Sequence, residues 1–542
     1  MKKIWMILGV ALFFSLNLAA QNSPKKPKLV VGIVVDQMRQ EYLYKYAARY
    51  GEDGFKRLMG DGFMMKNAHY NYIPTYTGPG HASVYTGTTP AVHGIIGNSW
   101  YSRKLNAAIY CAGDSTVSAV GGSQASGQIS PRNMLTTTIT DELRFSNNKK
   151  SKVVGIAIKD RGASLPAGHL GDAYWYDSGT GEFMTSTYYS DALPKWVEDF
   201  NGRELAAKYL ENTWNTLYPV DSYVNSIADN NDFEVGFGGK ETPTFPYNLA
   251  ELKAQNGELG MVATTPYGNT LTLDFAYAAL EGEQLGMRGE TDFLALSFST
   301  PDYIGHRFGP TSVELEDNYL RLDQEIAKFL NYLDQTYGKG EYLIFLTADH
   351  GVADIATYMM SENVPAGNFR LSYVNGVLKA YFNEVYGEGE WIKNFSNDQI
   401  FLNTDLAIEK DIDIDDMEEA AARFMLRFNG VKEVYTSTAM RNVDFTEGSA
   451  ALLQNGYNHK ASGELLVILE PGWLTGGPRG TTHGTGFSYD THVPILFYGW
   501  GVKAGSSSRK VAITDIAPTL SMMLGIRLPN GSTGQPLLEI LE

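Results

Sequence analysis

Four short apolar runs in this chain each end just before a side chain suited to metal or phosphate chemistry. Each run has the length and the apolar content of a buried strand. The carboxyl ends of parallel strands lie at one edge of an open sheet, so we expect the side chains after the runs to converge there. The runs are residues 29–35 before Asp36, 153–158 before Lys159, 293–299 before Asp302, and 343–347 before Asp349 and His350.

Helical patterns alternate with these runs. Between residues 315 and 330, apolar side chains recur at helical spacing, while Asp317, Asp323 and other charged residues take the remaining faces. We interpret this helix as ordinary core packing and assign its acidic residues no chemistry. Strands that alternate with helices are typical of an α/β fold, with a mostly parallel central sheet and helices on both faces. We predict a catalytic domain made of residues 21–353 and 471–542.

The segment from about 354 to 470 interrupts this alternation, and we expect it to form an inserted, smaller α+β subdomain. It could cap the active site, or it could be plain surface structure without a role in substrate binding. Its predicted elements are a strand at 377–382, a helix over 416–428 with a capping box of Asp415 and Glu418, a stop at Asn429-Gly430, and a strand at 431–435.

The first twenty residues have the pattern of a secretory signal peptide. Lys2 and Lys3 precede an apolar run that ends near Leu18, and the small residues Ala19 and Ala20 follow. The run is short for a membrane span, which favours a cleaved signal over the alternative of a membrane anchor. We therefore expect residues 1–20 to be removed and the mature protein to be periplasmic or secreted in a bacterium, without stable membrane association.

Composition and charge exclude some classes of protein. The 542 residues include 44 Lys plus Arg and 61 Asp plus Glu, a formal net charge of -17, which disfavours nucleic acid as a binding partner. An anionic substrate would therefore need local positive charge. Cys111 is the only cysteine, so no disulfide can form within the chain. Its thiol has no histidine next to it in sequence, and we interpret Cys111 as a small core residue.

The residues after the strands include a set of possible metal ligands. Asp302 and His306 are four residues apart, so one helical turn could direct both at one ion. Carboxylate and imidazole ligands together suit zinc. Each residue alone is a weak signal, but we expect them to meet at the same edge of the sheet. The full set is Asp36, Asp302, His306, Asp349, His350 and His483, and the other six histidines are interpreted as structural or outer-shell residues.

A hydroxyl nucleophile is predicted at the start of a helix. Residues 74–83, Pro-Thr-Tyr-Thr-Gly-Pro-Gly-His-Ala-Ser, indicate a loop that enters a helix. A side chain there meets backbone N–H groups and the positive end of the helix dipole, which favour an anion. Thr77 is the better-placed candidate and Thr75 is the second. A threonine hydroxyl needs a base or a metal to activate it, and the alternative is that Thr77 is only a helix cap.

Taken together, these motifs resemble the alkaline phosphatase superfamily, in the branch shared with type I phosphodiesterases and nucleotide pyrophosphatases. The motifs are Asp36, Thr77-Gly-Pro-Gly-His81, Asp302-x-x-x-His306, Asp349-His350-Gly351 and His483-Gly-Thr, and the tail from Ile513 to Leu520 is also similar. The resemblance implies two zinc ions. One would be held by Asp36, Asp349 and His350 and would bind the Thr77 oxygen, and the other by Asp302, His306 and His483.

Lys159-Asp160-Arg161-Gly162-Ala163 resembles the Thr-dependent alkaline phosphatases of flavobacteria. This resemblance implies that Asn98, Lys159 and Arg161 contact the phosphoryl oxygens and that a phosphothreonine forms on Thr77. A phosphate monoester carries more negative charge than a diester, so two nearby cations favour the monoester. We expect a monomeric zinc-dependent phosphomonoesterase that acts on small phosphorylated substrates.

Two other functions remain open from the sequence. A phosphodiesterase or nucleotide pyrophosphatase would use the same two-zinc site and would hold its second ester group in an aromatic pocket, for which Tyr174, Trp175 and Tyr176 are candidates. A catalytically silent protein that captures phosphorylated ligands would be expected to lose a metal ligand or the nucleophile. All these residues are present, so hydrolysis is the favoured interpretation.

Overall fold

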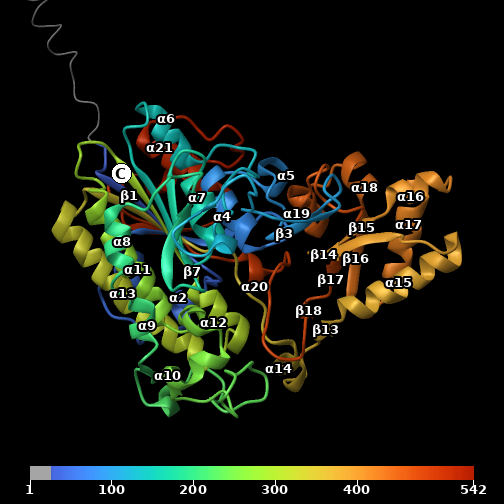
Figure 1. Ribbon diagram of the computed structural model, residues 1–542, viewed down its shortest axis with the longest axis horizontal. Coiled ribbons are helices and arrows are strands. Elements are labelled where there is room, and N and C mark those ends of the chain that lie inside the picture. Colours follow the sequence, from blue (N-terminus) through green and yellow to red (C-terminus); the bar gives the residue numbers. More distant parts are fainter. Residues whose placement is uncertain (1–25, 542) are drawn as a thin grey trace, which may run out of the picture.

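The computed structural model describes residues 26–541, so the predicted signal peptide lies outside the described residues. Its centre is a ten-stranded sheet with helices on both sides (Figure 1). Along the sheet the strands are β20 (Gly505–Ala512), β2 (Phe63–His69), β19 (Ile495–Gly499), β12 (Tyr342–Thr347), β1 (Leu29–Val35), β11 (Asp292–Phe298), β6 (Val153–Ala157), β7 (Asp172–Asp177), β8 (Glu182–Ser186) and β5 (Ala119–Val120).

The middle of the sheet is parallel. β1 pairs in parallel with β11 and with β12, and β6 pairs in parallel with β11 and with β7. Antiparallel pairs occur where β12 meets β19 and where β7 meets β8. The four predicted strands are therefore neighbours in the order β12-β1-β11-β6, and their carboxyl ends share one edge. Their apolar side chains belong to one large core, which explains why these runs lack polar alternation.

Helices cover both faces of this sheet. In Figure 1, α4 (Thr77–Thr86), α6 (Ile139–Ser146), α7 (Asp160–Ala167) and α21 (Ile516–Leu524) lie on one side, and α8 (Lys195–Asn201), α11 (Tyr267–Gly282) and α13 (Val313–Tyr337) lie on the other. This arrangement confirms the predicted fold class. α12 (Thr300–Phe308) follows β11 directly at the carboxyl edge of the sheet.

The long helix α13 differs from its sequence pattern in one respect. Asp317 and Asp323, which the pattern assigns to polar faces, are buried. Asp317 accepts hydrogen bonds from Trp214 Nε1 at 2.8 Å and from Tyr223 Oη at 2.7 Å. Asp323 accepts from the N–H groups of Gly51 and Phe55, each at 2.7 Å. These partners come from distant segments of the chain. The spacing of residues within the helix therefore could not predict that these carboxylates are buried and hydrogen-bonded.

A second apolar core lies within residues 369–469, beside the main sheet on the right of Figure 1. It contains a four-stranded sheet of β14 (Ile392–Ser396), β15 (Gln399–Leu402), β17 (Leu465–Leu469) and β16 (Val431–Thr436), with α15 (Leu371–Tyr386) and α17 (Ile414–Met425) packed on it. The boundaries 354–470 for an inserted subdomain stay a prediction.

Two predicted details of this region are wrong. Residues 377–382, predicted as a strand, lie inside α15, where Val374, Leu378 and Phe382 are buried at helical spacing. The N-cap of α17 is Asp413, whose side chain accepts from Asp416 N, rather than Asp415. Glu418 is not part of a capping box, because it accepts from Ser437 Oγ at 2.6 Å.

Candidate metal centre and active site

The carboxyl edge of the sheet brings all six predicted metal ligands into one region. Asp36 follows β1, Asp349 and His350 follow β12, and Asp302 lies in the first turn of α12. His483 comes from a loop after the second core. Two sets have ligand atoms that all lie within 4.8 Å of one another: Asp36 with Asp349 and His350, and Asp302 with His350 and His483.

Each of the three histidines turns Nε2 into the site, because its Nδ1 faces a backbone carbonyl oxygen. The Nδ1 of His350 lies 2.8 Å from Gly351 O, that of His306 lies 2.7 Å from Thr481 O, and that of His483 lies 2.7 Å from Thr75 O. A carbonyl oxygen can only accept, so Nδ1 carries a proton in each ring, and Nε2 is the nitrogen that a metal would bind when the ring is neutral. Histidines that bind metals are commonly held in this way.

We call Asp36, Asp349 and His350 the first group, and Asp302, His306 and His483 the second group. His306 belongs to the second group because it contacts Asp302. Its Nε2 lies 3.1 Å from Asp302 Oδ1, and His483 Nε2 lies 3.6 Å from the same oxygen. His350 and His483 also stack, with ring centroids 3.5 Å apart. His350 therefore stands between the two groups, which explains its place in both compact sets.

The first group contains two buried carboxylate oxygens without a partner. Asp36 Oδ1 and Asp349 Oδ2 have no hydrogen-bond partner among residues 26–541, and each lies 3.5 Å from His350 Nε2. Buried anionic oxygens are costly unless they are paired or bind a metal. This donor set, two carboxylates and one neutral imidazole nitrogen, fits a divalent cation.

The electrostatics agree with this interpretation. Burial, followed by the neighbouring Asp302 charge, raises the pKa of Asp36 to about 6. Burial and the charge of Asp36 raise the pKa of Asp349 well above its usual value. Burial lowers the pKa of His350 well below its usual value, so the ring is neutral and able to bind a metal. A bound cation would offset the repulsion among these carboxylates.

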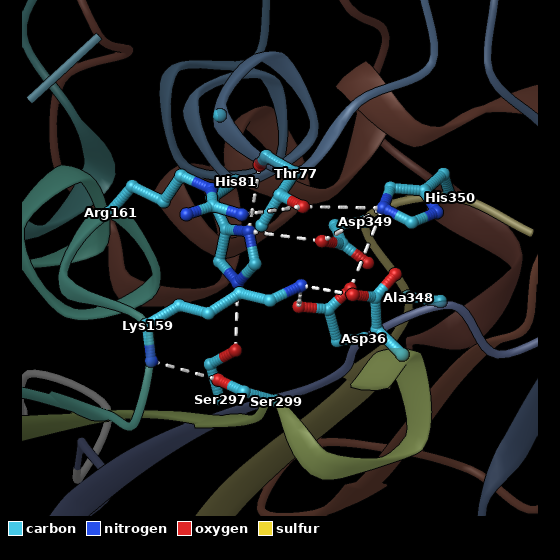
Figure 2. A network of polar contacts seen from close by, with 12 residues as sticks. Asp36, Thr77, His81, Lys159, Arg161, Ser297, Ser299, Ala348, Asp349 and His350 are labelled. Atoms are coloured by element: carbon cyan, nitrogen blue, oxygen red, sulfur yellow. Dashed lines mark hydrogen bonds and ion pairs between the residues drawn. The ribbon is translucent and has the colours of Figure 1, made fainter. Parts of the chain in front are cut away.

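Thr77 is the first residue of α4 and faces this group (Figure 2). Its Oγ1 lies 3.4 Å from His350 Nε2 and 3.5 Å from Arg161 Nη2. Gly80 lets the helix approach so closely, because a Cβ there would lie 2.2 Å from Asp349 O. The alternative nucleophile is not supported, since the Thr75 hydroxyl donates to Thr485 O at 2.9 Å.

The three residues predicted to contact the substrate lie at different places in the site. Arg161 points at the Thr77 hydroxyl, as Figure 2 shows. Asn98 Oδ1 accepts from Gly78 N at 2.7 Å, which fixes its amide beside the first turn of α4. Lys159 lies deeper, where its ammonium donates to Asp36 Oδ2 at 2.7 Å and also to Asp302 Oδ2. Its charge therefore lies between the two ligand groups.

Two residues outside the predicted set also contact the ligands. His81 accepts or donates at Ser297 Oγ, 2.8 Å from its Nε2, and its Nδ1 lies 2.9 Å from Thr77 O and 3.4 Å from Asp349 Oδ2. His81 was expected to be a structural or outer-shell residue, and these contacts place it beside the candidate ligands. Gln37 was missed, although it donates to both Asp349 and Asp302. No periodicity marks it, and its position directly after Asp36 is the only signal in the sequence.

The aromatic pocket considered for a diesterase is absent at residues 174–176. Tyr174, Trp175 and Tyr176 form part of β7 and are buried. Tyr174 packs on Trp196 and Tyr176 donates to Leu259 O. These three side chains are core residues, because Tyr174 and Tyr176 pack into one apolar cluster and Trp175 packs into another.

Comparison with known proteins defines the class. A sequence model of the family described as type I phosphodiesterase / nucleotide pyrophosphatase matches residues 30–492, and the chain belongs to this family. It is similar to alkaline phosphatase PafA of Elizabethkingia meningoseptica, with 42% identity over 543 residues that cover 99% of both chains. The crystal structure of wild-type PafA superposes with a TM-score of 0.93 at 43% identity, over 96% of this chain and 100% of that one.

A protein of Myroides odoratus that bears the name calcium-transporting ATPase is also similar. It is 46% identical over 545 residues, which cover 100% of this chain and 99% of that protein.

Within residues 26–541, no helix is both long enough and apolar enough to cross a membrane. The likeness to PafA in sequence and structure confirms the resemblance inferred from the motifs.

Proposed function

We propose that this chain is a metal-dependent alkaline phosphatase that hydrolyses phosphate monoesters through a covalent intermediate on Thr77. The observation that carries the proposal is the position of the Thr77 hydroxyl. It lies at the N-terminus of α4, 3.4 Å from His350 Nε2 and 3.5 Å from Arg161 Nη2. The similarity to PafA over the whole chain supports a phosphoric monoester hydrolase.

The ligand groups fit two zinc ions. Asp36, Asp349 and His350 would hold the first ion, and the second would be held by Asp302, His306 and His483. Zinc accepts both carboxylate and imidazole ligands, which favours it over calcium or magnesium. Bound at these positions, the cations would lower the pKa of the Thr77 hydroxyl and offset the negative charge of the leaving oxygen.

The residues of the chain then act in two steps. Thr77 Oγ1 attacks phosphorus, the bond to the ester oxygen breaks, and the alcohol leaves while a phosphothreonine forms. Arg161, whose Nη2 lies 3.5 Å from Thr77 Oγ1, stabilises the phosphoryl oxygens. A water molecule then attacks from the vacated side, which releases phosphate and restores the threonine.

Local positive charge favours the monoester over the diester. Arg161 lies beside Thr77, and Lys159 brings a second positive charge between Asp36 and Asp302. We propose that both cations and the Asn98 amide contact the non-bridging oxygens. The additional negative charge of a monoester strengthens these contacts, whereas a diester replaces that charge with a neutral ester group.

Replacing Arg161 with alanine tests this preference. We expect kcat/KM for an aryl phosphate to fall by about 100-fold, because one charged hydrogen-bond donor to the reacting group is lost. The same variant should lose less than about tenfold on the matching aryl methyl diester, which lacks the additional charge. Steady-state rates on both esters with the zinc-loaded protein give the comparison.

Arg132→Ala is the matched control for this experiment. Arg132 pairs with Asp114 at 2.7 Å and is half-exposed, so its replacement removes the same charge without touching Thr77. It should leave both activities unchanged. Equal losses on the two esters in Arg161→Ala would contradict the proposed preference and would favour a diesterase.

Other features of the proposal rest on the sequence. We propose that the protein is exported to the periplasm or secreted, because residues 1–20 have the pattern of a signal peptide. We also propose a monomer that acts on small phosphorylated compounds. Residues 354–470 are proposed as an inserted subdomain with its own core.

A further inference from the structure

Gln37 holds one carboxylate of each ligand group. Its backbone N–H donates to Asp349 Oδ1 at 3.1 Å, and its side-chain Nε2 donates to Asp302 Oδ1 at 2.7 Å. Asp349 belongs to the first group and Asp302 to the second. Gln37 is buried, so water does not compete for these two hydrogen bonds. One residue thus fixes the orientation of carboxylates that follow two different strands.

The backbone of Gln37 is unusual. Its φ is 68°, in the left-handed region that residues with a Cβ seldom adopt. Such a conformation persists only where the surrounding structure requires it, and it is found frequently at functional sites. Here the requirement is visible, because the peptide N–H reaches Asp349 while the side chain of the same residue reaches Asp302.

The neighbouring helix is shaped to receive the Gln37 side chain. A Cβ on Gly305 would lie 1.8 Å from Gln37 Oε1, so only glycine leaves room for the amide. Gly305 stands in α12 between Asp302 and His306. Gln37 Oε1 has no hydrogen-bond partner within residues 26–541, so the amide is held through its donor atom, Nε2.

The oxygen that Gln37 holds is the one that faces the histidines. Asp302 Oδ1 lies 3.1 Å from His306 Nε2 and 3.6 Å from His483 Nε2. The other oxygen, Oδ2, accepts from Lys159. Rotation of the carboxylate would turn Oδ1 away from both rings. The amide donor and the lysine together therefore fix which oxygen is presented to a cation.

We propose that Gln37 is a positioning residue that orients Asp302 for the second cation. Hydrogen-bonding partners of metal ligands commonly set the affinity of the site. Gln37 acts through Asp302 and does not contact the substrate. Through its backbone N–H, which donates to Asp349, it also connects the second cation site to the first. The inference rests on the proposed two-cation function and adds a residue that affects cation affinity at one of the two sites.

Gln37→Met tests the proposal, because methionine keeps the length and the backbone N–H but removes the amide donor. The affinity for one of the two zinc equivalents, the one at Asp302, His306 and His483, should fall by about 10- to 100-fold, while that for the other should change by less than about threefold. Isothermal titration of the chelator-stripped protein with Zn²⁺ measures both affinities without any activity assay.

Gln40→Met is the matched control. Gln40 is also buried, three residues further along, but its Nε2 faces Met64 Sδ at 3.9 Å. This variant should give the wild-type titration. Gly305→Ala, which displaces the Gln37 amide, should reproduce the selective loss. If Gln37→Met folds poorly, Gln37→Leu removes the same donor without adding a charge, and the same loss is expected.

Two results would separate the possible failures. If wild type binds two zinc equivalents and the Gln37 variants bind both with unchanged affinity, or lose both equally, the positioning role is wrong and the proposed function stands. If wild type does not bind two equivalents at all, both proposals are contradicted.

Discussion

Thr77→Ala is expected to lower the turnover of phosphate monoesters by at least about 1000-fold, the largest effect of any single substitution in this protein. The reason is chemical, since the variant has lost the hydroxyl that would form the covalent intermediate at the start of α4. The Thr75 hydroxyl, the nearest alternative in sequence, is committed to Thr485 O. Initial rates on an aryl phosphate with the zinc-loaded variant measure the loss.

Two further variants make this result specific. Thr77→Ser should keep a large part of the activity, because it retains a hydroxyl at the N-terminus of α4. Thr75→Ala should keep more activity than Thr77→Ala, since it removes a loop contact and no nucleophile. A Thr77→Ala enzyme that turns over within about tenfold of wild type would rule out the covalent mechanism.

Removal of metal is expected to have an effect of similar size on activity and a second effect on stability. Without a cation, Asp36 and Asp349 keep buried oxygens that no other residue among 26–541 satisfies. Chelation should therefore abolish hydrolysis, and added Zn²⁺ should restore it. A cation at 100 times its dissociation constant contributes about 2.7 kcal/mol to the free energy of unfolding, so the melting temperature should also rise with Zn²⁺.

The matched measurement uses Asp36→Asn. This variant loses a charge from the first ligand group, so its melting temperature should respond less to Zn²⁺ than that of wild type. Differential scanning calorimetry over a range of Zn²⁺ concentrations tests both statements. Full activity in excess chelator, or a melting temperature that does not change with Zn²⁺ concentration, would contradict the assignment of the ligand groups.

The architecture and the convergence of the candidate ligands could be predicted because each signal is local. Residues 29–35 and 343–346 are apolar throughout, as strands covered on both faces must be. Parallel strands place their carboxyl ends at one edge, so Asp36 and Asp349 converge whatever the remaining structure does. The spacing of Asp302 and His306 is one helical turn, which needs no knowledge of tertiary contacts.

Other features depend on partners that the sequence does not identify. A mostly apolar stretch of six residues such as 377–382 has the length of a strand, and only the wider spacing of Val374, Leu378 and Phe382 distinguishes a helix. Tyr174 and its neighbours are as aromatic as a binding pocket would be, but two apolar clusters that pack against β7 bury them. Gln37 carries no pattern at all, because its role arises from contacts with Asp302 and Gly305, more than 260 residues away.

The most direct test of the account is to identify the phosphorylated residue. Wild-type protein is mixed with an aryl phosphate, quenched in acid within its first turnovers, digested, and analysed by mass spectrometry. The account predicts one phosphate on Thr77 and none on Thr75. A quenched enzyme that accumulates phosphate on another residue, or rapid hydrolysis by the Thr77→Ala variant without any phosphoenzyme, would contradict it.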